Sequence, residues 1–230
     1  MSNPKRWCYA WFQGKPIGAG TTKAALKKDS KWDGDGQTIK VAFMSGDKAL
    51  QARVRDTALR WVAPGMANLN LNFTDDVDGA DVRIAFLAGD GSWSTVGTTC
   101  RQVPKNQATM NFGWINADSS EEDLRSVVLH EFGHAVGLIH EHQNPVAGIN
   151  WDRKKVIASL SGPPNNWSVQ EIEFNVLTPA SPQDVQATAL DSKSIMMYPF
   201  PADWTTDGFS AGFNSDLSDL DKKFIRKEYT

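Results

Sequence analysis

Hydrophobic and polar residues alternate along four short stretches in the first half of the chain. The stretches are residues 38–43, 68–74, 80–86 and 109–115. A period of two places every second side chain on one face of an extended strand, so the pattern predicts four half-buried strands. A shorter stretch, residues 91–97, is bounded by glycines. It predicts a further strand at the edge of the sheet.

After the first of these strands, apolar residues recur at every fourth position, and this spacing predicts a helix. Its apolar stripe consists of Leu50, Val54, Ala58 and Val62. Asp47 can cap the helix at its N-terminus, and Pro64 with Gly65 would end it.

A second helix is predicted from the residues at its N-terminus. Ser119 and Glu122 have the spacing of a capping box, and the acidic residues that follow complement the positive end of the helix dipole. Apolar surface to anchor this helix comes from Leu124, Val127, Val128 and Phe132. We therefore expect a firmly held helix that begins after Ser119.

The character of the chain changes after residue 140. Residues 141–217 are rich in Pro, Asn, Ser and Gly, and they predict little regular structure beyond a short helix after Asp152 and one near residues 168–176. A final helix begins after Ser218. This order predicts an α+β protein with one domain, residues 1–230. It comprises an extended N-terminal segment (1–36), an N-terminal lobe (37–140) and a C-terminal lobe (141–230), with a cleft between the lobes.

Composition narrows the classes of function. The net charge of −3 and the 22% of charged residues give no electrostatic reason to expect a nucleic-acid or membrane partner. We also expect the protein to be a monomer. No apolar run approaches the roughly 20 residues of a membrane span, and the first residues lack the apolar core of a signal peptide. We therefore expect a cytoplasmic protein, export by a non-classical route, or a trimmed chain. Cys8 and Cys100 leave one disulfide or two free thiols open.

All four histidines lie between positions 130 and 142, and three of them fall in the pattern H-E-x-x-H-x-x-G-x-x-H. In a helix, His130 and His134 present their imidazoles from one face, as two ligands of a tetrahedral zinc ion require. Gly137 can adopt a positive φ and turn the chain, so that His140 returns as a third ligand. Glu131 can hold a water at the zinc ion and take its proton. These residues predict one catalytic Zn²⁺.

The motif, its continuation His140-Glu141 and the later Ser194-Ile195-Met196-Met197-Tyr198 resemble the astacin family of zinc endopeptidases, within the metzincins, in a microbial branch. The resemblance extends from about residue 38 to the C-terminus. It implies a metzincin-type zincin fold, with a twisted mixed sheet and two long helices in the N-terminal lobe and an irregular C-terminal lobe that ends in a helix. It also implies an endopeptidase whose partners are protein or peptide substrates.

The resemblance further implies roles for single residues. Met196 would form a hydrophobic floor under the metal, and Tyr198 would be a switchable fifth zinc ligand that stabilises the oxyanion. Substrate would add as an antiparallel strand along Ser92, Trp93 and Ser94. Glu141 is expected to be structural. His142 is expected at the surface or beside the zinc ligands.

Several alternatives stay open at this point. Glu171 or Glu173 could supply a third zinc ligand, as in another zincin class. The chain could be a zinc-stabilised binding module descended from a protease. It could also be a latent enzyme, although Lys15 stands where many relatives have the aspartate that covers the zinc. In such a latent form Cys8 could serve as a thiolate ligand.

Overall fold

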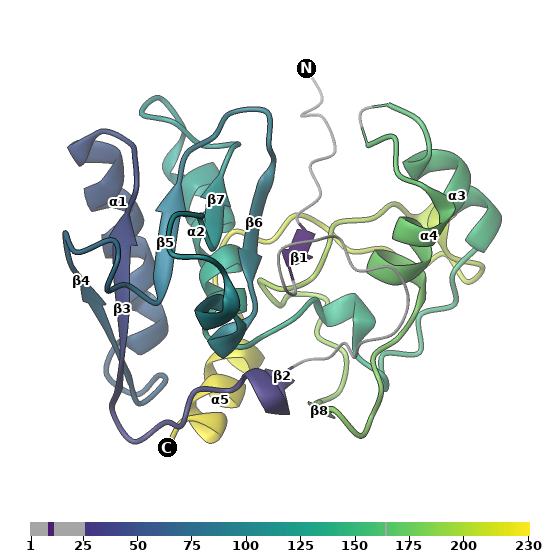
Figure 1. The fold of residues 1–230 in the computed structure, drawn as a ribbon. Helices are drawn as coiled ribbons and strands as arrows, with labels where there is room; N and C mark the ends of the chain where they lie inside the picture. The colour runs from purple at the N-terminus through teal and green to yellow at the C-terminus, as the bar shows by residue number, and fades with distance from the viewer. Residues whose placement is uncertain (1–8, 12–25, 164) are drawn as a thin grey trace.

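Six strands form the main sheet of the protein, in the order β1-β6-β7-β5-β3-β4 (Figure 1). The computed structural model describes residues 9–11, 26–163 and 165–230. The strands are β1 Tyr9–Trp11, β3 Gln37–Phe43, β4 Leu69–Phe73, β5 Val82–Ala85, β6 Ser92–Thr95 and β7 Met110–Phe112. Strands β3, β4, β5 and β7 are parallel, whereas β6 is antiparallel to β7. The sheet is therefore mixed, as predicted.

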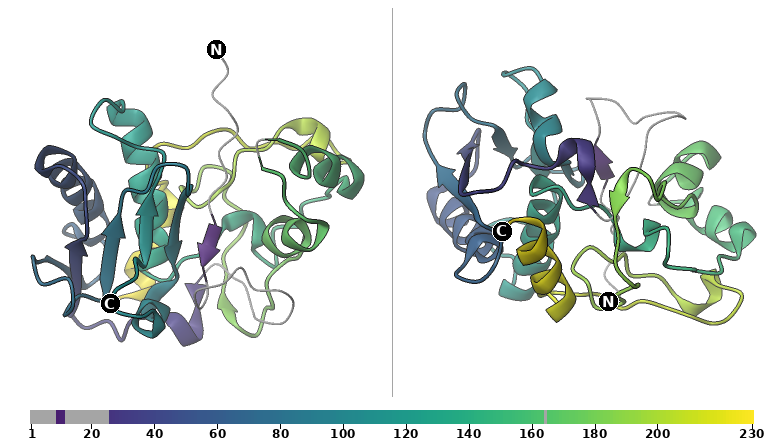
Figure 2. Two further views of the ribbon diagram at one scale, coloured as in Figure 1. Left: turned by 45° about the horizontal axis from the view of Figure 1, so that its top comes forward. Right: turned by 90° about the horizontal axis from the view of Figure 1, so that it is seen from below.

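Two helices pack on one face of this sheet, α1 (Lys48–Ala58) and α2 (Glu121–Ala135) (Figure 2). Asp47 caps α1, since its side chain accepts a hydrogen bond from the Leu50 N–H. The predicted stripe is buried at Leu50, Val54 and Ala58. Val62 belongs instead to η2, a 3₁₀ turn at Leu59–Val62 that extends the helix.

Ser120, and not Ser119, caps α2. The Ser120 hydroxyl accepts a hydrogen bond from the Asp123 N–H, whereas the Ser119 hydroxyl accepts one from the Asn116 N–H. The predicted start of the helix was therefore wrong by one residue, because two adjacent serines each have an acidic residue three positions later. Arg53 of α1 donates hydrogen bonds to the Ser119 carbonyl and to Glu121. This contact ties α1 to the start of α2.

The second half of the chain contains short elements. The helices are α3 Arg153–Leu160, α4 Val169–Ile172 followed by a π turn at Glu173–Leu177, and α5 Asp219–Glu228. The 3₁₀ turns here are Glu141–Gln143 and Ala202–Trp204; two others are Lys28–Ser30 and Gly97–Gln102. Strand β2 Leu26–Lys27 pairs with β8 Val185–Gln186. The predicted helices near 153, 168–176 and 219 are confirmed.

Two main hydrophobic cores lie in the described residues. The larger joins the sheet to α1, α2 and α5, and the smaller includes Val156, Trp167 and Ile172 of the second half. Residues 194–198, the Met-turn, contribute to both, because Met196 belongs to the larger core and Tyr198 to the smaller. The Met-turn therefore links the two halves of the molecule.

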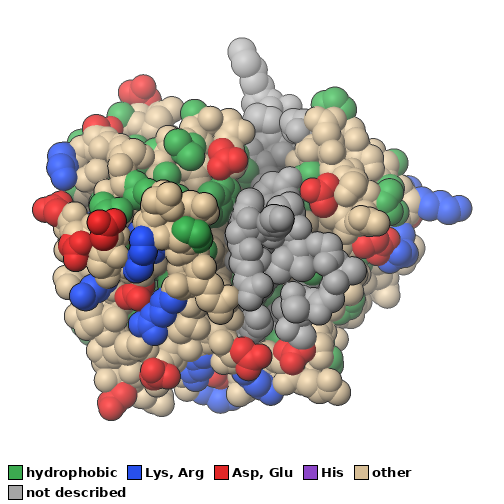
Figure 3. Space-filling model, in the orientation of Figure 1, with side chains coloured by type: hydrophobic (Ala, Val, Ile, Leu, Met, Phe, Trp, Pro, Cys, Tyr) green, Lys and Arg blue, Asp and Glu red, His purple; other side chains and the backbone are tan. Residues whose placement is uncertain are grey.

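The surface is mixed in charge. On the face in Figure 3, acidic and basic side chains are interspersed and do not gather into a patch of one sign. Among the described residues, no helix is both long and apolar enough to cross a membrane.

Candidate zinc site

Helix α2 carries the first part of the site, and three aromatic side chains hold its C-terminal half. Trp61 donates a hydrogen bond to the Leu129 carbonyl at 2.9 Å, and Trp32 donates one to the Ala135 carbonyl at 2.8 Å. The hydroxyl of Tyr229 donates to the Val136 carbonyl at 2.7 Å. The Ala135 and Val136 carbonyls lie at the helix end and lack partners within the helix, so Trp32 and Tyr229 satisfy these buried groups. Trp61 adds a further bond to a carbonyl inside the helix, and together the three donors fix the helix in place.

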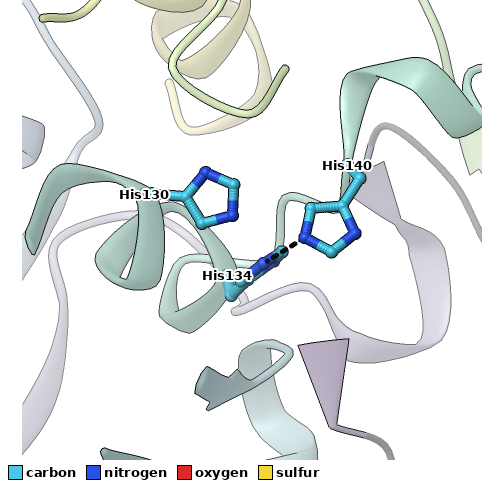
Figure 4. Close-up of side chains that lie close together, drawn as sticks. All are labelled: His130, His134 and His140. Carbon is cyan, nitrogen blue, oxygen red and sulfur yellow. Dashed lines mark hydrogen bonds between the residues drawn. The ribbon is translucent and has the colours of Figure 1, made fainter. Parts of the chain in front are cut away.

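His130, His134 and His140 converge on one point, the first two from α2 and the third from the segment after it (Figure 4). One ring nitrogen of each lies within 4.8 Å of the others. The Nε2 atoms of His134 and His140 are 3.1 Å apart. Two nitrogens bound to one tetrahedral zinc ion are about 3.4 Å apart, so the arrangement fits one zinc ion.

Hydrogen bonds select the metal-binding nitrogen of two of these rings. The Nδ1 atom of His130 lies 2.8 Å from the Ile195 carbonyl, and that of His134 lies 2.9 Å from the Leu138 carbonyl. Since a carbonyl only accepts, each Nδ1 carries the proton and each Nε2 keeps its lone pair. The His130 Nε2 atom is buried without a hydrogen-bond partner. A buried nitrogen of this kind fits a metal ligand.

Burial also favours the neutral imidazole that binds metal. It lowers the pKa of His130 to about 4, although the bond to Ile195 acts in the opposite direction. The pKa of His134 lies well below its usual value, chiefly through burial and then through the proximity of His130. Both rings are therefore uncharged at neutral pH, as zinc binding requires.

Gly137 makes the turn that brings His140 back to the helix. Its φ is 101°, a conformation that side chains with a Cβ rarely adopt. The N–H groups of Gly137 and Leu138 donate to the carbonyls of His134 and Gly133 and close the helix end. The chain therefore turns at Gly137, where the sequence predicts it to.

Glu131 is buried, with 1% of its surface exposed, and it lies in α2 next to His130. Met196 is 2% exposed and packs against Gly133. Both residues are therefore buried, Glu131 within the helix that carries His130 and His134, and Met196 against the same helix at Gly133.

Tyr198 lies in a stack of aromatic rings. Its ring centroid is 4.1 Å from that of His140 and 4.6 Å from that of His142. His142 is 3% exposed, and its Nε2 is 2.9 Å from the Asn175 carbonyl. His142 is therefore buried beside the ligands and is not a surface residue.

Strand β6 differs from the expected edge strand. Ser92, Trp93 and Ser94 pair with β7 on one side, and β1 occupies the other side in parallel orientation. The register places Tyr9 opposite Trp93. Cys8 and Lys15, which bear on the predictions about latency, lie outside the described residues.

The alternative third ligands are engaged elsewhere. Glu171 accepts hydrogen bonds from Ser168 in the capping box of α4, and Glu173 forms an ion pair with Arg153. Neither joins the histidine cluster among the described residues. The structure therefore gives no support to the other zincin class.

Two buried polar residues, Ser194 and Asp221, received no role from the sequence. Ser194 and Asp221 form a hydrogen bond of 2.7 Å at the Met-turn, and burial raises the pKa of Asp221. In the sequence Asp221 has only the features of a first-turn residue of α5, and its hydrogen bond to Ser194 joins positions far apart in the chain. Glu141 is also buried and accepts hydrogen bonds from Asn144 and from the Asp191 N–H; burial raises its pKa to about 7.

Comparisons with known proteins agree with this geometry. The model of the peptidase family described as Astacin matches residues 26–229. A solved structure of myroilysin is 39% identical, with a TM-score of 0.85, over 89% of this chain and 97% of that one. A second myroilysin structure is 34% identical, with a TM-score of 0.70, over 99% and 92%.

A more distant match shows similarity in fold alone. It is a hatching enzyme and zinc protease of the medaka fish Oryzias latipes, with 14% identity and a TM-score of 0.55 over 91% of this chain and 98% of that one. A comparison with curated protein sequences gives no match.

Proposed function

Because this chain belongs to the astacin family of zinc metallopeptidases, we propose that it cleaves extended polypeptides internally, with Glu131 as the general base and acid. Zinc held by the three histidines would supply a Lewis acid for the scissile carbonyl and for the attacking water. Glu131 takes the proton of that water and passes it to the leaving amine.

The observation that carries the proposal is the convergence of His130, His134 and His140, with a buried carboxylate one residue from the first of them. A structural zinc site is usually closed by a fourth protein ligand, whereas three ligands leave a position for water and substrate. In the proposed mechanism the buried Glu131 carboxylate serves that open position by proton transfer.

Tyr198 has a proposed second role in this reaction. Its ring lies against that of the predicted zinc ligand His140. A phenol can bind a metal through oxygen or donate a hydrogen bond to developing negative charge. We assign Tyr198 as the switchable fifth ligand and oxyanion donor.

The substrate would bind along β6, with main-chain hydrogen bonds to Ser92, Trp93 and Ser94. Adding a strand to a sheet edge recognises the backbone of a peptide rather than one side chain. Such binding requires an extended substrate, which is why an unstructured polypeptide is the expected class.

The decisive experiment replaces Glu131 with Gln. We expect kcat/KM on an unstructured protein such as casein to fall by about 10²–10⁴-fold, because the general base is lost. Zinc content, measured by elemental analysis, should stay the same. The matched control is Glu122→Gln, which changes an exposed carboxylate of the same helix and should keep full activity.

The outcome separates the remaining alternatives. Equal activity in wild type and Glu131→Gln would refute the mechanism. A wild type that binds zinc but cleaves nothing in a broad peptide library would favour the zinc-stabilised binding module.

A latent form is a second candidate, and β1 favours it. Tyr9–Trp11 takes the position beside β6 that an incoming substrate would need. Its parallel orientation is the reverse of the antiparallel one expected for substrate. A chain with β1 in place cannot add a substrate strand at those residues until β1 leaves.

A further inference from the structure

A continuous chain of hydrogen bonds links a buried carboxylate to one zinc ligand. The Nδ1 atom of His130 lies 2.8 Å from the Ile195 carbonyl. The N–H of the same peptide unit, that of Met196, donates to the Ser194 hydroxyl at 3.0 Å. Ser194 in turn donates to Asp221 Oδ1 at 2.7 Å.

The direction of every proton in this chain is determined. A peptide N–H can only donate, so the Ser194 oxygen accepts from Met196 and its own proton points at Asp221. The carbonyl of Ile195 can only accept, so His130 donates from Nδ1. Each donor therefore points toward the carboxylate, and the lone pair of His130 Nε2 points to the metal position.

Asp221 is well held for this role. Its Oδ2 atom accepts hydrogen bonds from the N–H groups of Ile195 and Ser218, at 2.8 and 2.9 Å. The carboxylate and Ser194 are both buried, at 7% and 2% exposure. Hydrogen bonds in a chain polarise one another, and they do so more strongly where water is excluded.

We propose that Asp221 and Ser194 are positioning residues for zinc binding, which act through the Ile195–Met196 peptide to orient His130 and raise the basicity of its Nε2. Metal-binding histidines commonly donate their second nitrogen to a carboxylate or a carbonyl. Here the carbonyl is itself polarised by a serine and a carboxylate. The inference depends on the zinc site and not on the role proposed for Glu131.

The test measures zinc affinity by competition with a chromophoric chelator. Ser194→Ala removes the hydroxyl that links Asp221 to the Ile195–Met196 peptide. Asp221→Asn removes the negative charge at the end of the chain of hydrogen bonds. We expect each change to weaken zinc binding by about 10–100-fold, the range for partners of metal ligands. The double variant should lose no more than the weaker-binding single variant, because both changes break the same chain.

A matched control separates this effect from general loss of stability. Ser218→Ala removes the hydroxyl that accepts the Asp221 N–H at the start of α5, but it leaves the chain to His130 intact. It should lower Tm while zinc affinity stays at the wild-type value. Circular dichroism of the zinc-free proteins verifies folding, and if Asp221→Asn does not fold, Ser194→Ala alone decides.

Three results would overturn the inference. One is an unchanged zinc affinity in folded Ser194→Ala. Another is a double variant whose loss equals the product of the two single losses. The third is a wild type that binds no zinc, which would also refute the metal site. A wild type that binds zinc without peptidase activity would contradict only the proposed function.

Discussion

At the scale of the residue, Gly133 determines how closely the Met-turn approaches the zinc-binding helix. A Cβ atom at this position would overlap the Met196 sulfur and lie 3.2 Å from the Trp61 ring. Both approaches are closer than ordinary carbon contacts. Gly133 occupies a position that the H-E-x-x-H pattern leaves unspecified. Glycine is needed there because Met196, a residue far away in the sequence, packs against this position.

We predict that Gly133→Ala lowers the free energy of unfolding by about 1–3 kcal/mol, the usual range for overpacking a filled core. Helix propensity alone would favour alanine by about 1 kcal/mol, so the two effects oppose each other and packing should win. Chemical denaturation measures the net change. The control is Gly162→Ala, since a Cβ there meets nothing within 4 Å. A stabilised Gly133→Ala protein would show that Met196 moves freely.

At the scale of the element, α2 is held at its start by capping and in its C-terminal half by aromatic donors. The capping bond forms at Ser120, although Ser119 has the same spacing to an acidic residue. Arg53 binds the Ser119 carbonyl and thereby fixes which serine precedes the first turn. A sequence pattern locates such a helix start within one or two residues, and a contact from another helix decides it.

Ser120→Ala should therefore lower the free energy of unfolding by about 0.5–2 kcal/mol, the range for loss of an N-cap. Ser119→Ala should have a smaller effect, because its hydroxyl accepts one hydrogen bond outside the helix, from the Asn116 N–H. Urea denaturation of the two variants in parallel provides the comparison. The reverse order of stabilities would restore Ser119 as the cap.

At the scale of the whole molecule, the N-terminal strand β1 pairs with the edge of β6 along which we propose that substrate binds. β1 pairs with Trp93, Ser94 and Thr95 of β6. The match to the family model begins at residue 26, so β1 precedes the residues that the family model covers. Each 1.4 kcal/mol of favourable β1 docking would lower the fraction of open enzyme about tenfold.

We predict that a chain beginning at Leu26 has a higher kcat/KM on an unstructured peptide than the 230-residue chain, by about tenfold or more if docking is worth about 1.4 kcal/mol. A synthetic peptide of residues 1–25 added to the shortened enzyme should restore inhibition that competes with substrate. Equal kcat/KM values for the two forms would argue against latency. Zinc content serves as the control and should be the same in both.

The sequence by itself determined the three histidines of the zinc site, most strands and helices, and the family. It did so because a helix imposes a fixed spacing on His130 and His134, and because alternation and capping are local properties of the chain. Only the tertiary structure decided the contacts between distant segments: Gly133 under Met196, β1 beside β6, and Asp221 linked to His130 through Ser194. Such contacts depend on how elements pack, which no local pattern records.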